Sequence, residues 1–133
     1  MASKALEGVK VAALIQGITG PLTAATLASY GAQVLRIESR TRIEWHRQAG
    51  PFIGEVALPD RSALYLIMNP GSYGITINLK HPRAIEVMTR IIKWVDVVVE
   101  NFAGGVMKRI GLGYEDLKKI KPDIIMLSAA IYG

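Results

Sequence analysis

The residues of this sequence that could do chemistry are suited to binding anions and amides, not to attacking a substrate. The chain has no cysteine and two histidines, His46 and His81, which lie far apart in the sequence. A thiolate nucleophile and a cysteine-ligated metal are therefore excluded, and neither histidine has the spacing of a metal-binding or catalytic pair. We expect no catalytic residue and no metal site in the chain.

A glycine-containing turn near the N-terminus has the chemistry of an anion-binding loop. The stretch Gly17-Ile18-Thr19-Gly20-Pro21 follows an apolar run and precedes a helical segment. Backbone N–H groups at such a helix N-terminus can hold an anion or an oxyanion. Gln16, Gly17, Ile18 and Thr19 are therefore candidate binding residues. The alternative is a turn whose glycines serve geometry alone.

A polar pair ends a run of valines further along the chain. The run 97–99 has the composition of a buried strand, and Asn101 and Phe102 follow it closely. An amide can hydrogen-bond a ligand amide, and an aromatic ring can cover an apolar arm. Arg109 lies in the next helical segment, where a guanidinium can bind phosphate oxygens. The alternatives are a core position for Phe102 and a solvated helix face for Arg109.

Alternating strands and helices must position these residues. We expect strands at 9–15, 33–38, 73–79, 96–101 and 124–130, with helices at 22–30, 62–69, 104–109, 114–120 and from Pro82 onward. Residues 39–61 lose all periodicity and contain several glycines and prolines, which predicts a long surface excursion. The pattern predicts a doubly wound α/β fold with a mostly parallel sheet of about five strands.

The last expected strand runs almost to Gly133, and no helix follows it. Ligands of open α/β sheets bind at the carboxyl ends of the strands. We therefore expect a sheet that is truncated after its last strand, at the place where a functional loop would normally begin.

The composition indicates a globular protein and argues against nucleic-acid and membrane partners. The chain has 133 residues, a net charge of +5 and 50% hydrophobic residues, which suits one globular domain. The basic residues are dispersed and the two phenylalanines offer little stacking surface, so we expect no nucleic-acid partner. The longest apolar runs are shorter than the roughly 20 residues of a membrane span, and the N-terminus lacks a signal-peptide pattern. We expect a cytoplasmic protein without a membrane partner.

Four stretches carry a resemblance to a known family. They are Leu6–Val11 leading to Gly20-Pro21, Leu27–Glu38, Val97–Phe102, and Gly105–Tyr114, and the chain closes on Tyr132-Gly133. In this order and spacing they resemble class III coenzyme A transferases of the CaiB/BaiF type, from Leu6 to Gly133.

The resemblance implies a Rossmann-like large domain built from both ends of a longer chain, a small domain between them, and two subunits interlocked as rings. Residues 1–133 would be the N-terminal part of the large coenzyme A-binding domain, with the small domain and the C-terminal part absent. The implied reaction moves coenzyme A from an acyl thioester to a carboxylic acid through an aspartate. That aspartate would follow the Tyr132-Gly133 element and lie beyond this chain.

The resemblance also implies roles for particular residues. The turn from Gln16 to Pro21 would approach the thioester end of coenzyme A, although Ile18 stands where a polar residue is common. Arg40, with Arg42 and Arg47 as further candidates, would lie near the phosphates. Asn101 and Phe102 would hold the pantetheine arm, and Arg109 would reach the diphosphate. In the stretch 69–75 the family's Lys-Arg pair is missing, which leaves the adenosine end without its usual cations.

Three classes of function stay open on the sequence. The first is the coenzyme A-binding part of a transferase, whose partners would be an acyl-CoA, a carboxylic acid, and either a second copy in a homodimer or a complementing C-terminal part. The second is a racemase of 2-methylacyl thioesters, and the third is a non-catalytic nucleotide-binding or assembly module. Residues downstream of Gly133 would discriminate among them.

Overall fold

Five parallel strands form one sheet in the order β3-β2-β1-β4-β5 in the computed structural model, which describes residues 3–54 and 56–130. The strands are β1 (Lys10–Leu14), β2 (Gln33–Glu38), β3 (Ser72–Thr76), β4 (Val97–Glu100) and β5 (Ile125–Ser128). The helices are α1 (Thr19–Ser29), α2 (Trp45–Gln48), α3 (Ala63–Met68), α4 (Ala84–Trp94), α5 (Val106–Arg109) and α6 (Tyr114–Ile120), with a 3₁₀ helix η1 (Pro59–Arg61). The predicted α/β class with its parallel sheet is confirmed.

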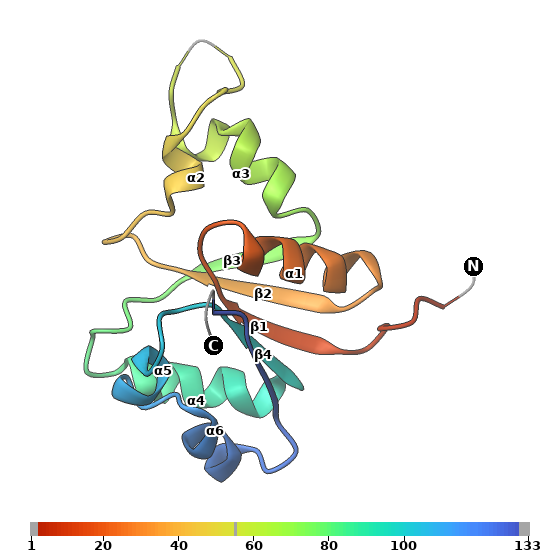
Figure 1. Ribbon diagram of the computed structural model, residues 1–133, viewed down its shortest axis with the longest axis vertical. Coiled ribbons are helices and arrows are strands. Elements are labelled where there is room, and N and C mark those ends of the chain that lie inside the picture. Colours follow the sequence, from red (N-terminus) through yellow and green to blue (C-terminus); the bar gives the residue numbers. More distant parts are fainter. Residues whose placement is uncertain (1–2, 55, 131–133) are drawn as a thin grey trace.

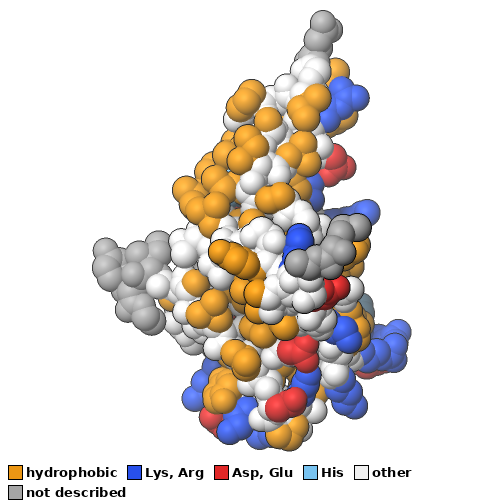
Figure 2. Space-filling view, turned by 90° about the vertical axis from the view of Figure 1, so that its right-hand side faces the viewer, with side chains coloured by type: hydrophobic (Ala, Val, Ile, Leu, Met, Phe, Trp, Pro, Cys, Tyr) orange, Lys and Arg blue, Asp and Glu red, His pale blue; other side chains and the backbone are white. Residues whose placement is uncertain are grey.

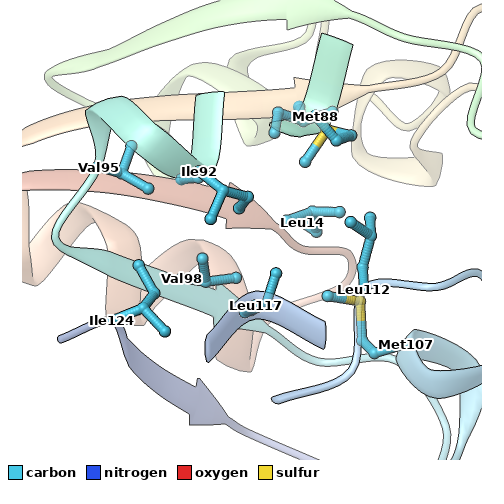
Figure 3. Packing of buried hydrophobic residues seen from close by; sticks show 11 residues of the cluster. Leu14, Met88, Ile92, Val95, Val98, Met107, Leu112, Leu117 and Ile124 are labelled. Carbon is cyan, nitrogen blue, oxygen red and sulfur yellow. The ribbon is translucent and has the colours of Figure 1, made fainter. Parts of the chain in front are cut away.

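The central strand β1 is buried on both faces because helices cover the sheet on both sides (Figure 1). Val11 and Ala13 belong to the apolar cluster on the α1 side. Ala12 and Leu14 point the other way, into a cluster with residues of α4, α5 and α6 (Figure 3). An apolar run that serves two cores is typical of a parallel strand, which is why this strand could be predicted.

Helix α1 begins at Thr19, earlier than the predicted start at residue 22. Pro21 is compatible with the earlier start because the first turn of a helix has no intrahelical partners for its N–H groups. Gly20 permits close packing there, since a Cβ on it would lie 2.6 Å from Cβ of Ile15 and 3.0 Å from Cγ of Asn101. The sequence at this point therefore sets how closely α1 approaches the ends of β1 and β4.

Helix α4 has the amphipathic pattern that the sequence predicts. Ala84, Met88 and Ile92 are buried against the sheet. Arg90 and Glu86 form an ion pair of 2.7 Å on the outer face. The chain crosses from one face of the sheet to the other between the end of β3 and the start of α4 (Figure 1).

The prediction of a surface excursion at 39–61 is wrong in part. Glu44 is 7% exposed and His46 is completely buried. The segment contains α2 and η1 and packs against α3, as the hydrogen bond from Ser62 Oγ to the carbonyl oxygen of Ala49 (2.7 Å) shows. It covers the side of β2 that carries Arg36. The loss of periodicity therefore marked an irregular and mostly exposed segment, but it did not reveal the two buried residues.

Large apolar side chains remain exposed at several places, among them the edge strand β5 and the region of α2 and α3. Ile125 and Leu127 on the edge strand β5 are 61% and 43% exposed. Hydrophobic side chains also gather on the upper half of the face in Figure 2, at the level where α2 and α3 lie in Figure 1. No helix in the described ranges has the length and apolarity of a membrane-spanning segment. The Tyr132-Gly133 element lies outside the described residues.

Candidate functional site

A cleft of about 760 Å³ opens at the carboxyl ends of β1, β2 and β4. The strand order reverses its direction between β1 and β4, and α/β sheets bind their ligands at such a switch point. The volume lies within the range of small-molecule sites. The cleft is lined by Leu14, Ile15, Gln16, Arg36, Ile37, Glu38, Ser39, Thr41, Arg42, Glu44, Ile77, Asn78, Leu79, Lys80, Asn101, Phe102, Ala103, Val106 and Ile110.

Gln16 and Asn101 join the two loops at the centre of the cleft. Leu14 pairs with Glu100 in the sheet, so the chain leaves β1 and β4 side by side. The backbone N–H of Gln16 donates to Oδ1 of Asn101 at 2.7 Å, and Nδ2 of Asn101 donates to the carbonyl oxygen of Gln16 at 2.6 Å. The side-chain amide of Asn101 thus makes the pair of hydrogen bonds that the backbone of a neighbouring strand would otherwise make, and it fixes the turn after β1.

Phe102 contributes both to the core and to the cleft. Its side chain packs against the cluster beneath α4 and α5, and it also lines the cleft. Its backbone N–H donates to Oε2 of Glu100 at 2.8 Å, and Glu100 is 6% exposed. Ile77, Leu79 and Ile110 extend this apolar wall.

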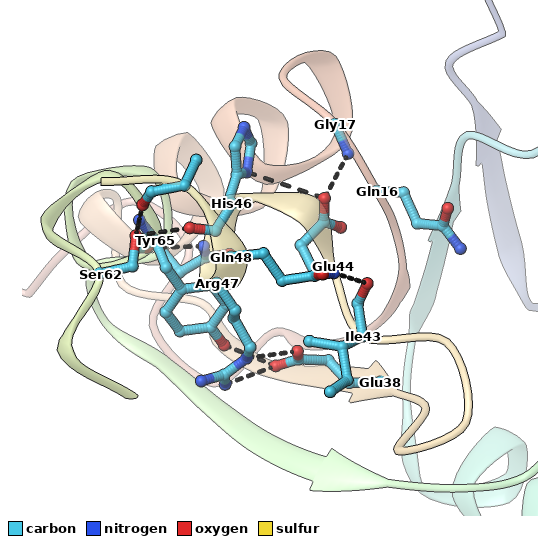
Figure 4. A network of polar contacts seen from close by, with 12 residues as sticks. Gln16, Gly17, Glu38, Ile43, Glu44, His46, Arg47, Gln48, Ser62 and Tyr65 are labelled. Carbon is cyan, nitrogen blue, oxygen red and sulfur yellow. Dashed lines mark hydrogen bonds and ion pairs between the residues drawn. The ribbon is translucent and has the colours of Figure 1, made fainter. Parts of the chain in front are cut away.

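The opposite wall carries a buried ion pair between β2 and the excursion. Nη2 of Arg36 lies 3.2 Å from Oε2 of Glu44, and the two side chains are 1% and 4% exposed. Nη1 of Arg36 also donates to Oδ1 of Asn69. The second carboxylate oxygen of Glu44 accepts from the backbone N–H of Gly17 at 3.3 Å (Figure 4). One carboxylate therefore links the excursion, the sheet and the turn after β1.

Glu38 forms a second ion pair on the same wall. Nε and Nη2 of Arg47 donate to its two oxygens at 2.8 and 3.0 Å, and the hydroxyl of Tyr65 donates to Oε1 at 2.5 Å (Figure 4). Burial works to raise the pKa of the Glu38 carboxyl, but the bonds from Arg47 and Tyr65 and the charge of Arg36 outweigh it and lower the pKa. Burial and the bond to Glu38 raise the pKa of Tyr65 to about 12. Glu38 is therefore ionised and Tyr65 neutral at physiological pH.

His46 lies behind this wall without a hydrogen bond on either ring nitrogen. Its Nδ1 is 3.9 Å from Oε1 of Glu44 (Figure 4), and its ring centre is 4.0 Å from that of Trp45. Burial lowers the pKa of His46, and the charge of Glu44 only partly opposes this. The imidazole is therefore neutral at physiological pH.

Two further cations border the cleft, Arg42 from the excursion and Lys80 from the segment after β3. Within the described ranges neither belongs to an ion pair, whereas Arg36 and Arg47 are bound to carboxylates. Those ranges also hold no group of His, Asp and Glu side chains that could bind a metal ion. An anionic ligand would contact Arg42 and Lys80 at the rim of the cleft.

A family model described as CoA-transferase family III matches residues 6–133. The chain belongs to this family. Succinyl-CoA:glutarate CoA-transferase of Homo sapiens is 35% identical over 131 residues, which cover 98% of this chain and 29% of that protein. Formyl-CoA:oxalate CoA-transferase of Afipia carboxidovorans is 34% identical over 138 residues and is covered to 30%. The chain thus spans less than a third of these family III relatives.

Two solved structures share the fold. The crystal structure of Rv3272 from Mycobacterium tuberculosis superposes with a TM-score of 0.88 at 31% identity, over all of this chain and 36% of that one. A CAIB/BAIF family protein from Brucella suis gives a TM-score of 0.84 at 33% identity, over 96% of this chain and 33% of that one. The fold described above therefore matches about a third of each of these two chains.

The cleft brings together three of the eight predicted site residues, Gln16, Asn101 and Phe102. Gly17 does not line the cleft, but its backbone N–H donates to Glu44, which does. The other predicted residues lie outside the lining: Ile18 and Thr19 are exposed at the start of α1, Arg40 is exposed between lining residues of the excursion, and Arg109 is exposed at the end of α5. Contact of these eight residues with a ligand stays a prediction.

Sequence reasoning missed the charged wall and the Lys80 rim. Arg36 stands at an alternating position of β2, where a polar residue is expected to face solvent. Glu44 lies in the segment without periodicity. The usable signal was the density of opposite charges, since arginines and glutamates are interspersed through residues 36–47, although the arginines outnumber the glutamates.

Proposed function

We propose that this chain is the coenzyme A-binding part of an enzyme that transfers coenzyme A from an acyl thioester to a carboxylic acid. The observation that carries the proposal is the cleft at the β1–β4 switch point, where Gln16, Asn101 and Phe102 meet in a member of CoA-transferase family III. The aspartate nucleophile that the resemblance implies would lie beyond this chain. The acyl-CoA and acid substrates, the homodimer and a cytoplasmic location belong to the same proposal.

The walls of the cleft suit the parts of coenzyme A. Phe102, Val106 and Ile110 form an apolar surface for the pantetheine arm, and the Asn101 amide retains capacity for a hydrogen bond to one of its amides. The thioester end would then lie at the turn after Gln16. Arg42 and Lys80 at the rim would face the phosphates and take the place of the missing Lys-Arg pair.

The charges of the wall favour an anionic ligand despite the two carboxylates. Arg36 neutralises Glu44, and Arg47 neutralises Glu38, so the wall carries no uncompensated negative charge. Arg42 and Lys80 then make the field of the cleft positive. Affinity for coenzyme A should therefore decrease as ionic strength rises.

Calorimetric titration of the chain with coenzyme A at low salt tests the proposal. We expect micromolar to millimolar affinity, because the chain spans less than a third of its relatives and the remaining segments of such a protein would add contacts. Arg109→Ala should weaken binding about tenfold, since a charge-assisted bond to phosphate is lost. Arg83→Ala is the matched control, because Arg83 precedes α4 and pairs with Glu86 at 3.1 Å on the surface.

No heat at millimolar coenzyme A would contradict the proposed binding. Equal losses in the two arginine variants would contradict the role of Arg109 and leave the cleft itself intact. Thioester exchange by the repurified chain would contradict the placement of the nucleophile beyond Gly133.

A further inference from the structure

The turn after β1 does not offer all of its N–H groups to a ligand, because two of them are bound within the chain. The N–H of Gln16 donates to Asn101. The N–H of Gly17 donates to Oε1 of Glu44. The turn is thus held from one side by the loop after β4 and from the other by the excursion after β2.

Glu44 is itself held firmly. Its other oxygen binds Arg36, both side chains are almost fully buried, and Arg36 is fixed in turn by Asn69. Loss of one partner of a buried ion pair leaves an uncompensated charge, which is strongly destabilising. An incoming ligand therefore does not displace Glu44, and the carboxylate acts as a strut between the sheet and the turn.

Gly17 has the backbone freedom that makes such a strut necessary. Its φ is +65°, and a Cβ added to it would meet no atom within 4 Å. Side-chain packing at Gly17 therefore does not fix the orientation of this peptide, whose carbonyl oxygen, that of Gln16, accepts from Nδ2 of Asn101 at 2.6 Å. A glycine in open space also has many accessible backbone conformations. The hydrogen bonds to Asn101 and Glu44 hold this peptide at its two ends, and Glu44 supplies the second of these constraints.

We infer that Glu44 is a positioning residue for coenzyme A: it fixes the Gly17 peptide and thereby orients the turn that receives the thioester end. The inference rests on the proposed function for the identity of the ligand. Glu44 acts through Gly17 and need not touch the ligand itself. Its removal should therefore weaken the thioester end of the ligand selectively.

The test compares two ligands, coenzyme A and adenosine 3′,5′-bisphosphate, which lacks the pantetheine arm and the thiol. Glu44→Ala should lower the affinity for coenzyme A about tenfold, because a misplaced contact group loses most of its benefit. The affinity for the bisphosphate should change less than about twofold on the same reasoning. The amide resonance of Gly17 should move in the variant without ligand.

Glu86→Ala is the matched control, because it removes a glutamate that also binds two arginines, Arg83 and Arg90, but on the outer face of α4. It should change neither affinity nor the Gly17 resonance. Should Glu44→Ala fail to fold, Glu44→Gln takes its place, since it keeps an oxygen for Gly17 and removes the charge. Its weaker acceptor should shift the Gly17 resonance and give a smaller loss that is again selective for coenzyme A.

Equal losses for the two ligands, or a Gly17 resonance that stays in place in the folded variants, would overturn the positioning role. The resonance decides this even if the unmodified chain binds no coenzyme A. That last result would contradict the proposed function separately.

Discussion

Arg47 and Arg40 both lie in the excursion 39–61, but they have different surroundings in the structure. Arg47 binds both oxygens of Glu38, lies over the ring of Tyr65 at 3.5 Å and is 19% exposed. Arg40 is exposed between Ser39 and Thr41, whose hydroxyl groups bind each other. The first arginine stabilises the fold of the wall, and the second is available to a ligand.

Arg47→Ala should lower the free energy of unfolding by about 2–3 kcal/mol, because it leaves the largely buried Glu38 carboxylate without its main partner. Arg40→Ala should change it by less than about 0.5 kcal/mol, as exposed substitutions do. Urea unfolding of the two variants measures both values. Equal stability of the two would show that the Glu38 pair contributes little.

His46 should make the chain less stable in mild acid. Its pKa in the folded chain is lowered by burial, so the unfolded chain binds a proton first as the pH falls below about 6.5. The free energy of unfolding should therefore be constant above that pH and decrease below it. Glu38 and Asp96, whose pKa values are also lowered, add their losses only at lower pH, near the usual carboxylate range.

His46→Phe keeps a ring of similar size and removes the titrating group. Urea unfolding at about pH 7.5 and about pH 5.5 should show a smaller difference for this variant than for the unmodified chain. His81→Phe, a change on the surface, is the control and should keep the difference. The same pH dependence in all three proteins would contradict the role of His46.

At the scale of elements, the close contact between α1 and the loop after β4 shapes the centre of the cleft. Gly20→Ala places a methyl group 2.6 Å from Ile15, so α1 must shift. We expect a loss of about 1–3 kcal/mol in the free energy of unfolding, as for other overpacked cores. Gly104→Ala is the control, since a Cβ there meets nothing within 4 Å. Thermal unfolding distinguishes them, and a stable Gly20→Ala variant would show that the contact is not tight.

The strands that are buried on both faces could be predicted from the sequence, because a short run of apolar residues is typical of few other structures. The run 97–99 led directly to Asn101 and Phe102, two residues of the cleft. Helix boundaries were less accurate, as the early start of α1 shows. The excursion could not be placed, since Glu44 and His46 are buried by contacts with β2 and α3 that no local pattern records. Arg36 was missed for the same reason.

At the scale of the whole molecule, the chain contains both walls of the cleft and leaves large apolar side chains exposed on its edge strand. The β1–β4 switch point and its two walls lie entirely within the described residues. The edge strand β5 keeps Ile125 and Leu127 exposed. The chain also covers less than a third of its family III relatives.

The proposed function depends most directly on where coenzyme A binds. Mapping of amide chemical-shift changes during a titration with coenzyme A measures this residue by residue. We predict that the largest changes fall on Gln16, Gly17, Lys80, Asn101 and Phe102 around the cleft, and that the amides of α6 change little. Changes concentrated on α6 and β5, or no changes at millimolar coenzyme A, would contradict the assignment of this cleft as the coenzyme A site.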